Sequence, residues 1–110
     1  IIRYVTESVT RKGADMIYTI EQIKDKCWKV FDKQNFIKEA YLFGSYARGE
    51  ATEKSDIDFM IVLNRTVGLE FFGLYHFLQE GFGKNVDVIS EKEAYGIMPK
   101  SIERDKVRVY

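Results

Sequence analysis

The chain has 110 residues, 45% of them hydrophobic and 15% aromatic, which predicts a compact domain with its own core and excludes a disordered chain. Seventeen basic and seventeen acidic residues cancel, so no broad positive field favours nucleic acid, and direct nucleic-acid binding is not expected. The longest apolar runs are only a few residues long and no signal peptide is visible, which predicts no membrane segment. The single cysteine, Cys27, cannot form an internal disulfide and favours a cytoplasmic location.

The first residues allow more than one interpretation. Residues 1–10 are rich in β-prone side chains, so they can add an edge strand or pair with a partner. They can equally be an extension upstream of the domain, including one introduced by cloning. We interpret residues 1–15 as an N-terminal extension and residues 16–110 as the domain.

The first predicted helix runs from residue 20 to about residue 32. Thr19 and Gln22 have the spacing of a capping box, in which each side chain bonds the other residue's backbone amide. Apolar residues then recur at helical spacing, at Ile20, Ile23, Cys27, Val30 and Phe31. This apolar face predicts that the helix packs against a sheet.

Two short apolar runs, residues 40–43 and 57–63, predict buried strands, and a small-residue turn follows the first of them. Gly44 at the strand end can adopt backbone angles that residues with a side chain avoid. The amides of Gly44 and Ser45, with the Ser45 hydroxyl, can then donate to phosphate oxygens. A lone Gly-Ser turn is common, so this feature alone is a weak indication of phosphate binding.

Two carboxylates mark the start of the second strand. Asp56 and Asp58 are two residues apart, so on an extended chain their side chains leave the same face. Like charges this close repel, and a divalent cation such as Mg2+ would relieve the repulsion by taking both as oxygen ligands. An isolated Asp-x-Asp is more often a solvated edge or a cap, so its meaning depends on the turn beside it.

The rest of the chain continues the alternation of helices and strands. We predict a helix from Leu69 to Gly81 or Gly83, a strand at residues 85–89, a short helix at residues 100–105 and a final strand or extended tail at residues 107–110. The fold class is therefore α/β (α+β), with a small mixed sheet and helices packed mainly on one face.

Aromatic residues and the only histidine, His76, lie in the predicted second helix. We interpret His76 as a partly exposed helical residue, because no second histidine is present to build a zinc site. The aromatic series is interpreted mainly as core, with some members facing a partner: Phe71, Phe72, Tyr75, Phe77 and Phe82.

The turn and the carboxylates together form a specific pattern. Gly-Ser, ten residues, then Asp-hydrophobic-Asp entering an apolar strand resembles the signature of the polymerase β-like nucleotidyltransferase superfamily. The sequence Ala47-Arg48-Gly49, with Ser55 before the first aspartate, resembles the minimal nucleotidyltransferase (MNT) family within it. The resemblance covers roughly residues 18–110.

The resemblance implies a third carboxylate from a neighbouring strand, which Asp87 fits. It implies that three residues are catalytic and hold metal, with two Mg2+ ions as cofactors: Asp56, Asp58 and Asp87. It implies ATP as substrate and the following nucleotide-binding residues: Gly44, Ser45, Arg48 and Ser55. Lys54 is a further candidate for phosphate and Tyr46 for packing beside the nucleotide, whereas Arg48 and Lys54 can also be ordinary solvated surface charges.

The resemblance also implies a function. MNT proteins are commonly paired with a helical HEPN protein, and transfer AMP from ATP to a tyrosine of that toxin, acting as its antitoxin. We therefore expect a HEPN partner in a hetero-oligomer, with a homodimer as another arrangement. Two alternatives stay open, namely transfer to an aminoglycoside-like small molecule and a non-catalytic module that neutralises a partner by contact.

Overall fold

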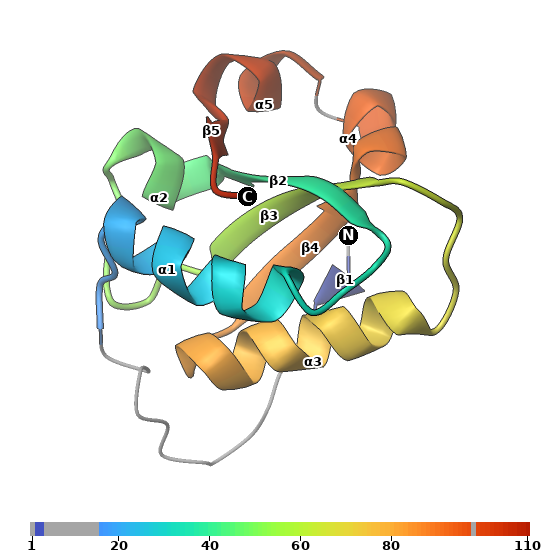
Figure 1. Ribbon diagram of the computed structural model, residues 1–110. Helices are drawn as coiled ribbons and strands as arrows, with labels where there is room; N and C mark the ends of the chain where they lie inside the picture. The colour runs from blue at the N-terminus through green and yellow to red at the C-terminus, as the bar shows by residue number, and fades with distance from the viewer. Residues whose placement is uncertain (1, 4–15, 98) are drawn as a thin grey trace.

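The computed structural model describes residues 2–3, 16–97 and 99–110, which form one mixed sheet with helices on both faces (Figure 1). The strands lie in the order β1-β4-β3-β2-β5. Their bounds are β1 Ile2–Arg3, β2 Ile37–Phe43, β3 Ile57–Leu63, β4 Val86–Ser90 and β5 Val107–Arg108. β3 and β4 are parallel, and the other neighbouring pairs are antiparallel. The predicted α/β class is confirmed.

In the described part of the chain, five helices connect the strands. The two long ones, α1 (Ile20–Phe31) and α3 (Glu70–Phe82), contact each other and cover one face of the sheet (Figure 1). The shorter α4 (Glu91–Ile97) and α5 (Pro99–Asp105) cover part of the other face, and α2 (Gly44–Arg48) follows β2 directly. The long helices thus lie on one face, as predicted.

Strand alternation divides the sheet's side chains between two apolar clusters. On β3, Phe59 and Ile61 face the main core beneath α1 and α3. Met60, between them, belongs instead to a small cluster with Ala94 of α4 and Ile102 of α5. The cluster also contains Ile89 of β4 and Phe43 of β2, and Phe43 pairs with Asp58, so the cluster extends along β3 to the acidic residues. On the same face of the sheet, the acidic residues lie at the amino ends of β3 and β4.

Local sequence signals account for several helix ends. The capping box before α1 forms as predicted: the Thr19 hydroxyl accepts from the Gln22 amide at 3.1 Å, and the Thr19 amide donates to Gln22 Oε1 at 2.9 Å. α3 ends at Gly83, whose φ of 64° is in the left-handed region that glycine favours. β2 begins at residue 37, three residues before the predicted start, and β5 has two residues.

The helix α4 was not predicted. A capping box begins it: Glu93 Oε1 accepts from the Ser90 amide and hydroxyl, and the Ser90 hydroxyl accepts from the Glu93 amide. The spacing of Ser90 and Glu93 was therefore the sequence signal that could have located this helix.

The N-terminal residues are described only in part. Ile2 and Arg3 pair with Val88 and Asp87 of β4 in antiparallel register. Residues 4–15 lie outside the described part of the chain, so the division at residue 15 stays a prediction. Among the described residues, every helix falls short of the length and apolarity that crossing a membrane requires.

Candidate active site

A sharp strand-to-helix elbow forms the centre of the site. β2 ends at Phe43 and α2 begins at the next residue, Gly44, whose φ is 73°. A Cβ on Gly44 would lie 2.2 Å from Oδ2 of Asp58, closer than any real contact allows. Glycine is therefore required here both for the backbone angle and for space, and the Asp58 carboxylate lies directly against the elbow.

Asp58 and Asp87 are direct neighbours across the parallel strands β3 and β4. Both point to the face opposite α1 and α3, because Phe59 on β3 and Val88 on β4 face the main core. Asp58 is half-buried and Asp87 is only 8% exposed. The strand register thus places two carboxylates side by side next to the Gly44 elbow.

Asp56 ends the loop that leads from α2 into β3. Ser55 shapes this loop, since its hydroxyl accepts from the Thr52 amide at 2.8 Å and its own amide donates to the Thr52 carbonyl at 3.0 Å. Asp56 is half-buried and two residues before Asp58, so alternation directs both side chains to the same side of the chain. Ser55 has a structural role in the loop, and contact of Ser55 with nucleotide stays a prediction.

The side chains fit a magnesium site that is completed by substrate. Within residues 2–3, 16–97 and 99–110, no three acidic, histidine or cysteine side chains are close enough to form a full metal site. Mg2+ usually takes only one or two protein carboxylates and completes its shell with substrate phosphates and water. The neighbouring Asp58 and Asp87 carboxylates can supply the protein ligands of such an ion. They lie beside an elbow whose first-turn amides have no acceptor within α2 and can bind the substrate phosphates.

Arg48 lies at the end of α2 and is already paired. Its Nε is 2.7 Å from Glu50 Oε1, and its NH1 is 3.5 Å from Oδ2 of Asp105 in α5. The hydrogen bond that Arg48 donates to Glu50, with a smaller contribution from Asp105, raises the pKa of Arg48 above its ordinary value. Arg48 therefore connects α2 to α5, and its predicted contact with phosphate would compete with these pairs. Lys54 is exposed.

The prediction for Tyr46 was wrong. Tyr46 is 3% exposed and belongs to the main core, so its ring packs against the protein interior. Burial also raises the pKa of its hydroxyl. The helix α2 has only five residues, and Tyr46 is the residue that anchors it to the core, which explains the error.

Sequence reasoning missed Lys84, which lies between α3 and β4 and is 6% exposed. Its ammonium donates to the carbonyls of Met16 and Glu53, at 2.8 Å in both cases. Lysine is almost always exposed, so nothing in the hydrophobic pattern indicated that this side chain is buried.

Two other residues behave as predicted. His76 is half exposed, with Nε2 3.9 Å from Glu80 on the same helix, and Cys27 is fully buried in the main core.

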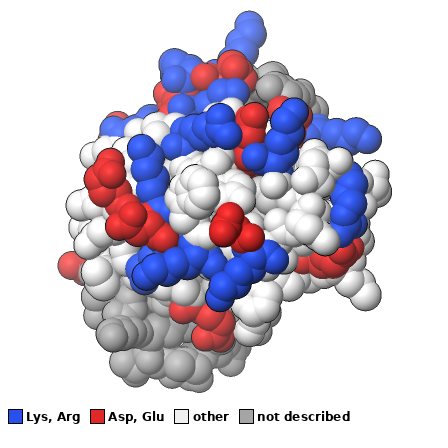
Figure 2. Space-filling model, in the orientation of Figure 1, with Lys and Arg blue, Asp and Glu red and all other residues white. Residues whose placement is uncertain are grey.

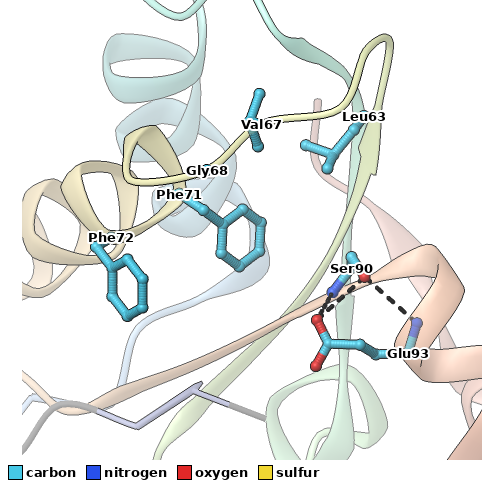
Figure 3. A pocket seen from close by; sticks show the side chains of 7 residues that line it. All are labelled: Leu63, Val67, Gly68, Phe71, Phe72, Ser90 and Glu93. Carbon is cyan, nitrogen blue, oxygen red and sulfur yellow. Dashed lines mark hydrogen bonds between the residues drawn. The ribbon is translucent and has the colours of Figure 1, made fainter.

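A separate hollow of about 240 Å³ lies at the other ends of β3 and β4 (Figure 3). Its polar members, Ser90 and Glu93, bond to each other at the start of α4. The remaining lining is apolar or glycine, formed by Leu63, Val67, Gly68, Phe71 and Phe72. Because β3 begins at the aspartates and ends at Leu63, this hollow is distinct from the acidic site.

A mixed sheet, a Gly-Ser elbow and carboxylates on adjacent strands define the class of nucleotidyltransferases. Residues 20–109 match the family described as "Nucleotidyltransferase domain". The chain therefore belongs to this family and is a nucleotidyltransferase, and the predicted MNT resemblance is confirmed.

Relatives of known sequence support the same assignment. Two proteins of Methanocaldococcus jannaschii, each named "Putative protein adenylyltransferase" (MJ1379 and MJ0128), are 38% and 40% identical over 82% and 83% of this chain. The matches cover 94% and 98% of those proteins. "Protein adenylyltransferase MntA" of Thermococcus cleftensis is 32% identical over 66% of this chain and 75% of its own length.

Solved structures share the fold. A chain of "the toxin-antitoxin with AMP-PNP" superposes with a TM-score of 0.69 at 22% identity, covering 79% of this chain and 72% of that one. A chain of the tri-AMPylated Shewanella oneidensis HEPN toxin in complex with MNT antitoxin gives a TM-score of 0.64 at 19% identity, covering 84% and 72%.

Proposed function

We propose that this protein is the antitoxin of a toxin–antitoxin pair and transfers AMP from ATP to a tyrosine of a HEPN toxin, in the cytoplasm. The observation that carries the proposal is the position of Asp58, which lies against the Gly44 elbow and beside Asp87. Relatives named protein adenylyltransferase and structural neighbours that are toxin–antitoxin complexes support the acceptor class.

Different residues of the site would bind the phosphates and the metal in such a transfer. The amides of Gly44 and Ser45, in the first turn of α2, would donate to the triphosphate of ATP. Asp56, Asp58 and Asp87 would hold Mg2+, which when bound neutralises phosphate charge and favours ionisation of the acceptor hydroxyl.

The reaction balances without another reagent. The acceptor oxygen forms a bond to the α-phosphorus while the bond from that phosphorus to the bridging oxygen breaks, and pyrophosphate leaves. The hydroxyl proton passes to solvent or to Asp87. Phosphoryl-type transfer depends mainly on positioning and charge neutralisation, so a small site with few other groups is sufficient.

The surface charge agrees with a protein acceptor. Figure 2 shows Lys and Arg intermixed with Asp and Glu on the face it displays. The chain has no net charge, and this favours a specific partner over binding to a polyanion such as RNA.

The test is to incubate the protein with labelled ATP, Mg2+ and the HEPN protein encoded beside it, and to look for added AMP on the toxin by mass spectrometry. Wild type should label a tyrosine, and Asp58→Ala should reduce labelling by about a hundredfold or more, as expected when a principal electrostatic group is removed. Labelling by Asp58→Ala at the wild-type rate would disprove the metal assignment.

The intact acidic site disfavours a non-catalytic module, because a purely structural protein gains nothing by placing two carboxylates side by side. That alternative is supported instead if wild type and Asp58→Ala both transfer nothing yet both suppress toxicity. Labelling of an aminoglycoside, with none of the HEPN protein, would support the small-molecule alternative.

A further inference from the structure

A buried lysine connects the parts of the chain that carry the acidic residues. Lys84 lies in the three-residue connection between α3 and β4, and its ammonium donates at 2.8 Å to the carbonyls of Met16 and Glu53. A buried ammonium is costly unless hydrogen bonds replace its lost water, so these bonds must be kept for Lys84 to remain in place. Lys84 is therefore a fixed point in the structure.

The segment between α3 and β4 holds the loop before β3 at two points, one on each side of Asp56. On one side Lys84 binds the carbonyl of Glu53, and on the other the carbonyl of Asn85 accepts from the amide of Ile57 at 3.2 Å. Asp56 lies between these two attachments. Its backbone is thus tied at both ends to the segment that leads into β4.

The same segment sets the position of the neighbouring carboxylate. Two residues after Asn85, β4 carries Asp87, which is paired in register with Asp58 of β3. Strand pairing fixes Asp58 relative to Asp87, whereas Asp56 belongs to the loop that ends where β3 begins, at Ile57. Among the described contacts, the Lys84–Glu53 bond is the side-chain attachment that relates the loop before Asp56 to β4.

We propose that Lys84 is a positioning residue, which holds the loop of residues 52–56 so that Asp56 faces the metal-bound nucleotide. This rests on the proposed function, because it assigns Asp56 a part in binding Mg2+ and ATP. Loss of the ammonium leaves the Glu53 carbonyl without this charged donor, and the loop then samples other arrangements.

The test compares Lys84→Met, which keeps the apolar stem, with Lys26→Met as a matched control. Lys26 is half-buried and also donates to a backbone carbonyl, that of Gly81, at 3.0 Å, but it connects α1 to the end of α3 and not to the loop. Hydrogen exchange of the amides in residues 52–57 and calorimetric titration with ATP, with Mg2+ and with EDTA, are measured on each protein. If Lys84→Met does not fold, Lys84→Gln replaces it.

Lys84→Met should accelerate exchange in residues 52–57 by at least about tenfold and weaken Mg2+-dependent ATP binding by about tenfold, leaving binding in EDTA unchanged. Lys26→Met should do neither. Wild-type exchange in the Lys84 variant, or faster exchange with unchanged Mg2+-dependent affinity, would overturn the inference. Failure of wild type to bind ATP with Mg2+ is a different result, since it overturns the proposed function, while the exchange comparison still decides whether Lys84 holds the loop.

Discussion

Both the backbone angle and the lack of space for a Cβ require glycine at position 44, whereas only the backbone angle favours glycine at position 49. Gly44 and Gly49 both have φ near 73°, but a Cβ on Gly44 would collide with the Asp58 carboxylate, whereas a Cβ on Gly49 would meet nothing within 4 Å. Comparing the two positions separates backbone strain from disturbance of the site.

We expect Gly49→Ala to lower the free energy of unfolding by about 1–2 kcal/mol, the cost of a left-handed angle for a residue with a Cβ, and to leave AMP transfer close to wild type. Gly44→Ala should cost at least as much stability and in addition reduce transfer by about a hundredfold, because Asp58 must move. Urea denaturation and the labelling assay measure both. Equal transfer activity in the two variants would contradict this account of the elbow.

Cys27 gives a second prediction for a single residue. Its thiol is fully buried, and burial raises its pKa far above the ordinary value. Since the thiolate is the reactive form, native protein should not react with iodoacetamide at pH 8 over an hour, whereas protein in guanidinium chloride should be modified completely. Mass spectrometry measures the added group, and rapid modification of the native protein would show that the α1 core opens readily.

At the scale of elements, Arg48 joins two helices that are far apart in the sequence. It connects α2 to α5 through Asp105, whose carboxylate is mostly buried by its surroundings at 12% side-chain exposure. Hydrogen bonding from Arg104, and then from Arg48, lowers the pKa of Asp105 from its ordinary 3.8. The contribution of these pairs to stability is therefore complete above pH 3.8 and is lost as pH falls through the lower folded value.

A pair of variants separates the structural role from phosphate binding. If Arg48 only connects the helices, Arg48→Met and Asp105→Asn should lower stability by similar small amounts and leave the KM for ATP unchanged. If Arg48 also contacts phosphate, Arg48→Met alone should raise that KM, by roughly tenfold for a lost charged hydrogen bond. An equal rise in KM for Asp105→Asn would show that the effect comes from a shifted α2.

The elements that sequence predicted well are those with local signals. The capping box of Thr19, the glycine end of α3 and the apolar runs of β3 and β4 are patterns within a few residues, and the structure has them all. The site is partly of this kind, because the pattern from Gly44 to Asp58 is continuous in sequence.

What could not be predicted depends on contacts between distant segments. Lys84 binds carbonyls 31 and 68 residues away in sequence, and Tyr46 is buried only because of how α2 packs on the core. The pairing of Arg48 with Asp105 is likewise a result of α5 folding back over α2. No pattern within one segment encodes these contacts, whereas α4 was predictable in principle from its capping box.

At the scale of the whole molecule, ligand binding and stability should be coupled through the acidic face. Asp58 and Asp87 are neighbours of like charge, so a divalent cation bound between them would reduce the repulsion of their carboxylates. A ligand that binds only the native state stabilises it by about 2.7 kcal/mol at a hundred times its dissociation constant. Saturating Mg2+ and ATP should therefore raise the wild-type melting temperature by several degrees.

Asp87→Asn should abolish this rise, because an amide cannot replace the carboxylate as a charged ligand of Mg2+. Asp25→Asn is the matched control, because Asp25 is an exposed carboxylate on α1, which covers the face of the sheet opposite the acidic residues, and it should keep the full shift. Differential scanning fluorimetry with and without Mg2+ and ATP measures all three proteins. A full shift in Asp87→Asn would mean that metal and nucleotide bind elsewhere, and would remove Asp87 from the site even if Asp58 remained essential.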